Sequence, residues 1–159
     1  MAPTIQGLGT MDIELAVFDA HLVAGFDALD DMSDDKKVAH AQLLTRHITH
    51  SYLWVLGAYE IVRSIAQRYF EGDRKAPDLL GIKEVKNQFA RLRMPLAKYE
   101  AAKASSEDSP IAYPAFNRDK GVAWQIGAEL FVTREELADA LLNLLEHMPP
   151  HAERPRRSE

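Results

Sequence analysis

Residues 52–62, with the sequence Tyr-Leu-Trp-Val-Leu-Gly-Ala-Tyr-Glu-Ile-Val, decide the fold that this chain can adopt. On a helix, the apolar side chains of this segment point in nearly every direction, and Glu60 is the only charged group among them. A helix that is apolar all round has to be surrounded by other elements. The segment therefore predicts a helix bundle that has residues 52–62 in its central member.

Apolar residues also recur at helical steps of three and four elsewhere in the chain. The spacing predicts a first helix that begins at Thr10, helices over 34–71 and 77–104, and a last helix that begins after Thr133. Thr133 and Glu136 form a capping-box pattern at its start. The inward stripes are Leu15, Phe18, Leu22, Gly25, Leu29 and Met32 in the first helix, Ile82, Val85, Phe89, Leu92, Leu96 and Tyr99 in the third, and Leu137, Leu141, Leu144 and Met148 in the fourth.

Between the third and fourth helices the pattern changes to that of strands and a turn. Residues 111–116 and 122–126 flank the turn-forming sequence 117–121, which predicts a short β-hairpin. Residues 130–132 are either a third strand or an extended entry into the last helix. The predicted fold is mainly α, a helix bundle of about four helices with a small β-hairpin between helices three and four.

The chain has 159 residues, the size of one domain. We expect a single helical-bundle domain over 1–148, with an irregular lead-in over 1–9 and a flexible C-terminal tail over 149–159. The absence of cysteine excludes disulfides and thiol nucleophiles. The chain shows no signal-peptide pattern and no apolar run long enough to cross a membrane, so we expect a cytoplasmic protein without a membrane partner.

The net charge of −5 is unevenly distributed along the chain. Residues 1–35 contain acids but no Lys or Arg, whereas bases outnumber acids in residues 63–103. One interpretation is that the acidic first helix packs beside the basic third helix, so that their charges offset each other. The other is that the basic segment forms an anion-binding surface.

Three histidines are candidate metal ligands. His47 and His50 are three positions apart, so both imidazoles can project from one face of a helix, and His21 on the first helix can supply a third nitrogen. The alternative is that these histidines are exposed or hydrogen-bonded locally. No glutamate is followed by a histidine three positions later, so the Glu-x-x-His pattern of di-iron bundles is absent.

Glu60 is a candidate for a buried carboxylate because its sequence neighbours are apolar. Burial of a carboxylate is costly unless the group is paired, and without a partner its pKa rises. We expect Glu60 to be buried and paired with a base such as Arg63, as a structural ion pair that fixes helix register. The alternative is a perturbed acid that serves as a general acid–base catalyst.

Arg91, Arg93 and Lys98 are candidate ligand-binding residues for phosphate or RNA. Arg46 and His50 are candidate catalytic residues, since helical ribonucleases of the HEPN superfamily use an arginine and a histidine on one helix. Only three residues separate the two here, which departs from the longer spacing of that motif, so no membership follows. The P-loop, dinucleotide-binding and metalloprotease motifs are absent, and no cofactor is expected.

The function that these patterns favour is association, with a second copy of the chain as a homodimer or with a partner protein. The reason is that the apolar stripes exceed what any visible chemistry needs. The alternative is a module that binds nucleic acid or a phosphate ligand, including a metal-independent ribonuclease built around Arg46, His50, Arg91 and Arg93. The sequence does not decide whether the chain is an enzyme.

Overall fold

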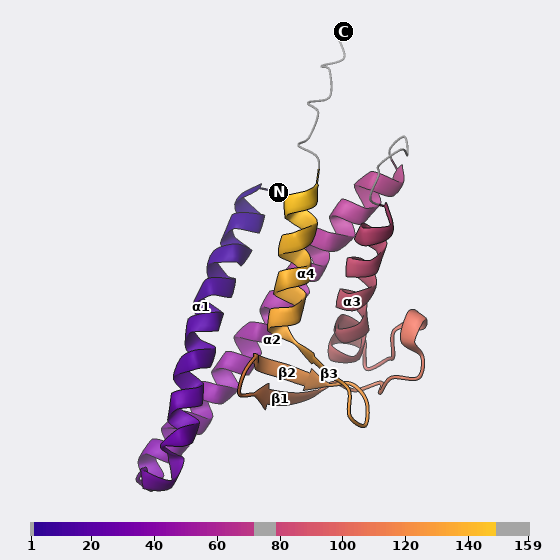
Figure 1. Cartoon of the computed structure of the whole chain (residues 1–159). Coiled ribbons are helices and arrows are strands. Elements are labelled where there is room, and N and C mark those ends of the chain that lie inside the picture. Colours follow the sequence, from indigo (N-terminus) through magenta and orange to yellow (C-terminus); the bar gives the residue numbers. More distant parts are fainter. Residues whose placement is uncertain (1, 72–78, 149–159) are drawn as a thin grey trace.

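The computed structural model describes residues 2–71 and 79–148 (Figure 1). It confirms the mainly α fold, with four helices and a three-stranded antiparallel sheet between helices three and four. The predicted junction over 72–76, the predicted start of the third helix at Pro77 and the predicted tail over 149–159 lie outside the described residues. In chain order the elements are α1 (Ala2–Asp27), a 3-10 turn (Leu29–Asp31), α2 (Asp34–Glu71), α3 (Leu79–Lys98), a second 3-10 turn (Lys103–Ser105), β1 (Tyr113–Asn117), β2 (Gly121–Gln125), β3 (Phe131–Thr133) and α4 (Arg134–His147).

The long helix α2 is the central member of the bundle, as residues 52–62 predicted. It packs against α1, α3, α4 and β2, and Figure 1 shows it running behind α4, with α1 and α3 to either side. Its inner side chains are fully buried, and Trp54 is the largest of them. The buried set from this segment comprises Trp54, Val55, Ala58, Ile61 and Val62.

The prediction of an irregular lead-in before Thr10 is wrong, because α1 is already helical at Ala2. Ile5 and Leu8 pack against the core, and the backbone carbonyl of Leu8 accepts a hydrogen bond from Nε1 of Trp54 at 3.0 Å. These long-range contacts stabilise a first turn that the glycines of this segment would weaken on their own.

The third helix ends earlier than predicted, at Lys98 rather than near residue 104. Tyr99 has a left-handed backbone, with φ of 56°, and its side chain is exposed rather than part of the buried stripe. A left-handed residue at this position terminates a helix. The chain then turns, and Asp108 comes back beside Arg91 of α3.

The sheet confirms the predicted hairpin and adds β3, so the segment after 130 is a strand before it enters α4. Strand order is β1-β2-β3, which leaves β1, with Pro114, at an edge. The central strand β2 is buried through Val122 and Trp124. Residues 117–121 form the connecting turn, where the side-chain oxygen of Asn117 accepts from two backbone amides and Gly121 has φ of 73°.

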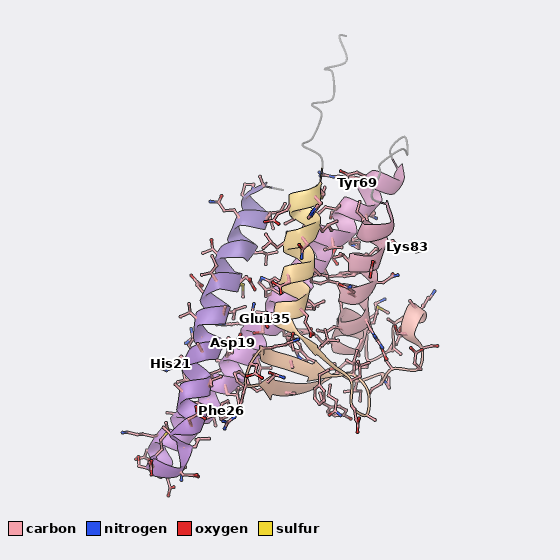
Figure 2. The ribbon with its side chains drawn as sticks, viewed as in Figure 1. Asp19, His21, Phe26, Tyr69, Lys83 and Glu135 are labelled. Atoms are coloured by element: carbon pink, nitrogen blue, oxygen red, sulfur yellow. The ribbon has the colours of Figure 1, made fainter. Side chains whose placement is uncertain are left out.

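The acidic and basic helices do not pack together, contrary to the first interpretation of the charge pattern. α1 packs on α2 and β2, whereas α3 packs on α2 and α4. Figure 2 labels His21 on α1 and Lys83 on α3 at opposite sides of the molecule. The two charge surfaces therefore remain separate.

Candidate functional site

The outward face of α1 is apolar along most of its length. Ile13 and Val17 are both 68% exposed, and Ala20 and Ala24 continue the same stripe one turn at a time. Gly9 precedes Ile13 on this stripe, and an added Cβ there would meet nothing within 4 Å. Together these five residues, here called the α1 face, include no charged side chain.

An apolar groove lies next to the α1 face, between α1 and α4. It has a volume of about 320 Å³, and Trp54 forms part of its lining. Leu142 of α4 is an exposed apolar residue of the groove, and Ile13 belongs both to the groove and to the α1 face. A helix that is apolar on two opposite sides needs a partner on each, and within the described residues α1 has one only on its inner side.

A buried polar network fixes α1 on its inner side. Asp19 of α1 accepts hydrogen bonds from Nε2 of His47 at 2.6 Å, from the backbone amide of Val122 at 3.1 Å and from Nη2 of Arg134 at 2.8 Å. Arg134 also binds Asp12 through Nη1. Figure 2 places Asp19 at the level where α1 passes the sheet and the start of α4. The network thus joins all four elements that meet there.

The two carboxylates of this network differ in their pKa. Burial by itself would raise the pKa of Asp19, but the hydrogen bonds from His47 and Arg134 outweigh it and hold that pKa below its usual value. Burial raises the pKa of Asp12, and the repulsion from Asp139 and Asp19 adds to that effect, more than Arg134 lowers it. Asp19 is therefore the more acidic of the two carboxyl groups.

Two local features allow the network to form, one by leaving space for Asp19 and the other by positioning Arg134. Gly121 lies against Asp19, so that an added Cβ would overlap the carboxylate, and its positive φ suits glycine. The capping box of Thr133 and Glu136 is confirmed, with both hydrogen bonds present. It starts α4 at Arg134, which places the guanidinium beside α1.

Glu60 is not buried, so that part of its prediction is wrong. Its side chain is 49% exposed and pairs with Nε of Arg63 at 2.7 Å, the partner that the sequence indicated. On the helix, Glu60 points away from the inner side that Trp54 and Ala58 occupy, and the half-exposed pair is an ordinary i,i+3 surface pair.

The three candidate metal ligands do not form a metal site. The ring of Phe18 is 6.0 Å from that of His21 and 4.8 Å from that of His47. Nε2 of His47 binds Asp19 instead. Among the described residues, no three His, Asp or Glu side chains are grouped so that they could hold an ion.

The candidate basic segment of α3 is largely occupied by contacts within the chain. Nε and Nη2 of Arg91 bind the buried carboxylate of Asp108 at 2.5 and 2.8 Å. Arg93 lies over the ring of Tyr59, 5.1 Å from its centroid. Lys98 is exposed. The Nε and Nη2 edge of the Arg91 guanidinium thus has a structural partner.

The candidate catalytic residues Arg46 and His50 do come together. Both line an open hollow of about 780 Å³ between α1 and α2, and His47 lines the same hollow. Glu14 faces it from α1. Glu60 and the α3 arginines are not part of it.

Asp19 and Arg134 are the site residues that the sequence reasoning missed. Two signals pointed to them. Asp19 lies one helical turn from both Leu15 and Leu22, on the inward side of its helix. Arg134 is a cation in the first turn of a helix, where the helix dipole disfavours positive charge.

No family model matches the chain, and no curated protein or solved structure is significantly similar to it. No helix within residues 2–71 and 79–148 combines the length and the apolar character needed to cross a membrane.

Proposed function

We propose that the protein works by self-association, as a twofold dimer that pairs the α1 face of one copy with that of a second copy. The observation that supports this proposal is the α1 face itself, an uncharged apolar stripe at the centre of which Ile13 and Val17 are both 68% exposed. An exposed contiguous apolar stripe on a helix is a candidate interaction surface. Closed twofold dimers are the commonest assembly.

The sizes of the side chains fit an antiparallel pairing centred near Val17. In that register Ile13 of one copy meets the small Ala20 of the other, and Gly9 meets Ala24. Ile13, the largest side chain of the stripe, therefore lies opposite a small one, which lets two helices approach closely, and the two copies of Val17 meet near the axis. The same stripe is its own complement, as a twofold interface requires.

The expected dimer is weak. The stripe from Gly9 to Ala24 spans roughly 22 Å of helix axis, and at a width of about 10 Å it offers roughly 220 Å² per copy. Stable interfaces bury about 800 Å² per partner. Even with Leu142 and the groove included, we expect a dissociation constant of about 10–100 µM.

Salt should strengthen the dimer, because α1 contains acids but no Lys or Arg. Two α1 helices side by side repel each other, and salt screens that repulsion while apolar contacts persist. Binding of a nucleic acid would weaken with salt instead. The direction of the salt effect thus separates the favoured function from its alternative.

The test combines sedimentation with a designed crosslink. Wild-type protein is measured from about 5 to 500 µM, at about 0.05 and 0.5 M NaCl. Because the chain has no cysteine, Val17→Cys should form a disulfide across the twofold axis under mild oxidation. Val38→Cys is the matched control, at a residue 58% exposed on α2, and should stay uncrosslinked.

The proposal also predicts that Val17→Asp abolishes the dimer, whereas Val38→Asp leaves it intact. Val17→Asp places two carboxylates opposite each other near the axis. A monomer mass at 500 µM, or equal crosslinking of the two cysteine variants, would overturn the proposal. A dimer that survives Val17→Asp would show that another surface is responsible.

A further inference from the structure

The hollow between α1 and α2 has the features of a small-ligand site, on the flank of α1 away from the groove. Its volume of about 780 Å³ lies in the range of small-molecule sites. Met11, Leu15 and Leu53 give it an apolar surface, and its polar side chains come from both helices. Apolar walls with few polar groups are typical of such sites.

His47 is held in one orientation at this hollow. Asp19 accepts from its Nε2, and Asp19 is itself fixed by Arg134 and by the amide of Val122. Because an ionised carboxylate is only an acceptor, Nε2 of His47 carries a proton, and in the neutral tautomer of such an imidazole Nδ1 is an acceptor. The ring of Phe18, 4.8 Å away, packs against the imidazole.

The charged groups of the hollow are on opposite walls. Arg46 comes from α2 and Glu14 from α1, and neither forms an ion pair within the described residues. His50 lies one helical turn from Arg46. A guanidinium next to an imidazole suits an anionic oxygen group, whereas Glu14 and Nδ1 of His47 suit hydrogen-bond donors.

We propose that this hollow binds a small phosphomonoester that also bears hydroxyl groups. Its phosphate lies between Arg46 and His50, and a hydroxyl donates to Nδ1 of His47. Glu14 accepts from a second hydroxyl and disfavours a bare anion. The proposal goes beyond self-association and does not depend on it, because the α1 face does not include the hollow.

The test measures binding of ribose 5-phosphate and of inorganic phosphate by calorimetry. The ε1 proton of each histidine is followed by NMR at the same time. We expect ribose 5-phosphate to bind at least about tenfold more tightly than phosphate, since only the former can donate to His47 and Glu14. Signals of His47 and His50 should shift on addition of either, and that of His147, on α4, should not.

Variants on the two walls make the test specific. Arg46→Gln should weaken the binding of ribose 5-phosphate about tenfold or more, while Arg63→Gln, on the same helix but outside the hollow, leaves it unchanged. Glu14→Gln should strengthen the binding of inorganic phosphate about two- to fivefold by removing a repulsive charge. All three residues are on the surface or partly exposed, so the fold, checked by circular dichroism, should persist.

Several outcomes would overturn the proposal. One is that no histidine ε1 signal shifts with about 10 mM of either compound, a concentration well above the dissociation constant expected of a functional site. Another is equal binding by wild type and Arg46→Gln. Equal affinity for phosphate and ribose 5-phosphate would show that the hydroxyl groups are not bound, and would refute the proposed ligand class. None of these outcomes depends on the oligomeric state.

Discussion

Substitution of Arg134 by methionine tests the buried network directly. Methionine keeps most of the hydrocarbon volume, so the change removes the charge and its hydrogen bonds more than the packing. Arg134 is 3% exposed and contacts both Asp12 and Asp19. Breaking a buried ion pair from one side costs about 3–5 kcal/mol, because the remaining charge stays buried without a partner.

The lower end of that range applies here. Asp12 is 30% exposed and can recover part of its hydration, and Asp19 keeps its hydrogen bonds to His47 and Val122. We therefore expect a loss of about 3 kcal/mol in the free energy of unfolding. For a protein of this length the loss corresponds to a fall of about 6–12 °C in Tm.

The matched control is Arg118→Met. Arg118 also pairs with an aspartate, Asp27, but its side chain is 67% exposed, so the same substitution should cost less than about 0.5 kcal/mol. Urea melts followed by circular dichroism measure both variants. Equal losses for the two would refute the buried network.

The pH dependence gives an independent check on the same variant. A carboxylate with a lowered pKa stabilises the fold above its unfolded value, and this contribution is lost as the pH falls through the folded pKa. In Arg134→Met the pKa of Asp19 should rise toward or above the ordinary value of about 3.9. The difference in stability between wild type and variant should therefore shrink as the pH falls from 7 to about 3. A difference that is constant with pH would mean that charge is not its source.

Substitutions at three other positions test contacts elsewhere in the fold. Gly121→Ala should cost more than about 2 kcal/mol in urea melts, because it combines a positive φ with a clash against Asp19; a loss below about 1 kcal/mol would mean that Asp19 lies elsewhere. Glu60→Ala should lower stability by less than about 0.5 kcal/mol, as for an exposed pair, and a loss of several kcal/mol would point to burial after all. Arg91→Ala should cost about 2–3 kcal/mol by stranding Asp108, without changing RNA retention in filter binding; loss of RNA retention without loss of stability would assign Arg91 to a ligand.

The helices of the bundle were predictable because their spacing is a local property. The predicted helix over 34–71 has the observed bounds of α2, and the capping box at Thr133 forms as its residues indicate. The start of α1 and the end of α3 were predicted wrongly. α1 extends to Ala2 through contacts with Trp54, far along the chain, and α3 ends at Lys98, before the left-handed Tyr99. Contacts between distant segments override local preference at such ends.

Glu60 shows the limit of reading burial from sequence neighbours. Its neighbours are apolar, but several of them lie on the outer side of α2, and Leu53 is exposed as well. Exposed apolar residues are common on folded proteins and do not imply that a neighbouring acid is buried. The inner side of α2 is set by Trp54 and Ala58, and Glu60 lies opposite.

The pairing of the network around Asp19 could not be predicted from the sequence, because His47 and Arg134 are 28 and 115 positions away from Asp19. Whether His47 and Arg134 meet on one carboxylate depends on how the hairpin sits on α1, and residue periodicity does not specify that docking. The two oxygens of Asp19 are divided between Arg134, on the groove side of α1, and His47, at the hollow. Under the two proposals above, Asp19 is a single fixed anion that orients both the α1 face and His47, so loss of Arg134 should weaken self-association and ligand binding alike.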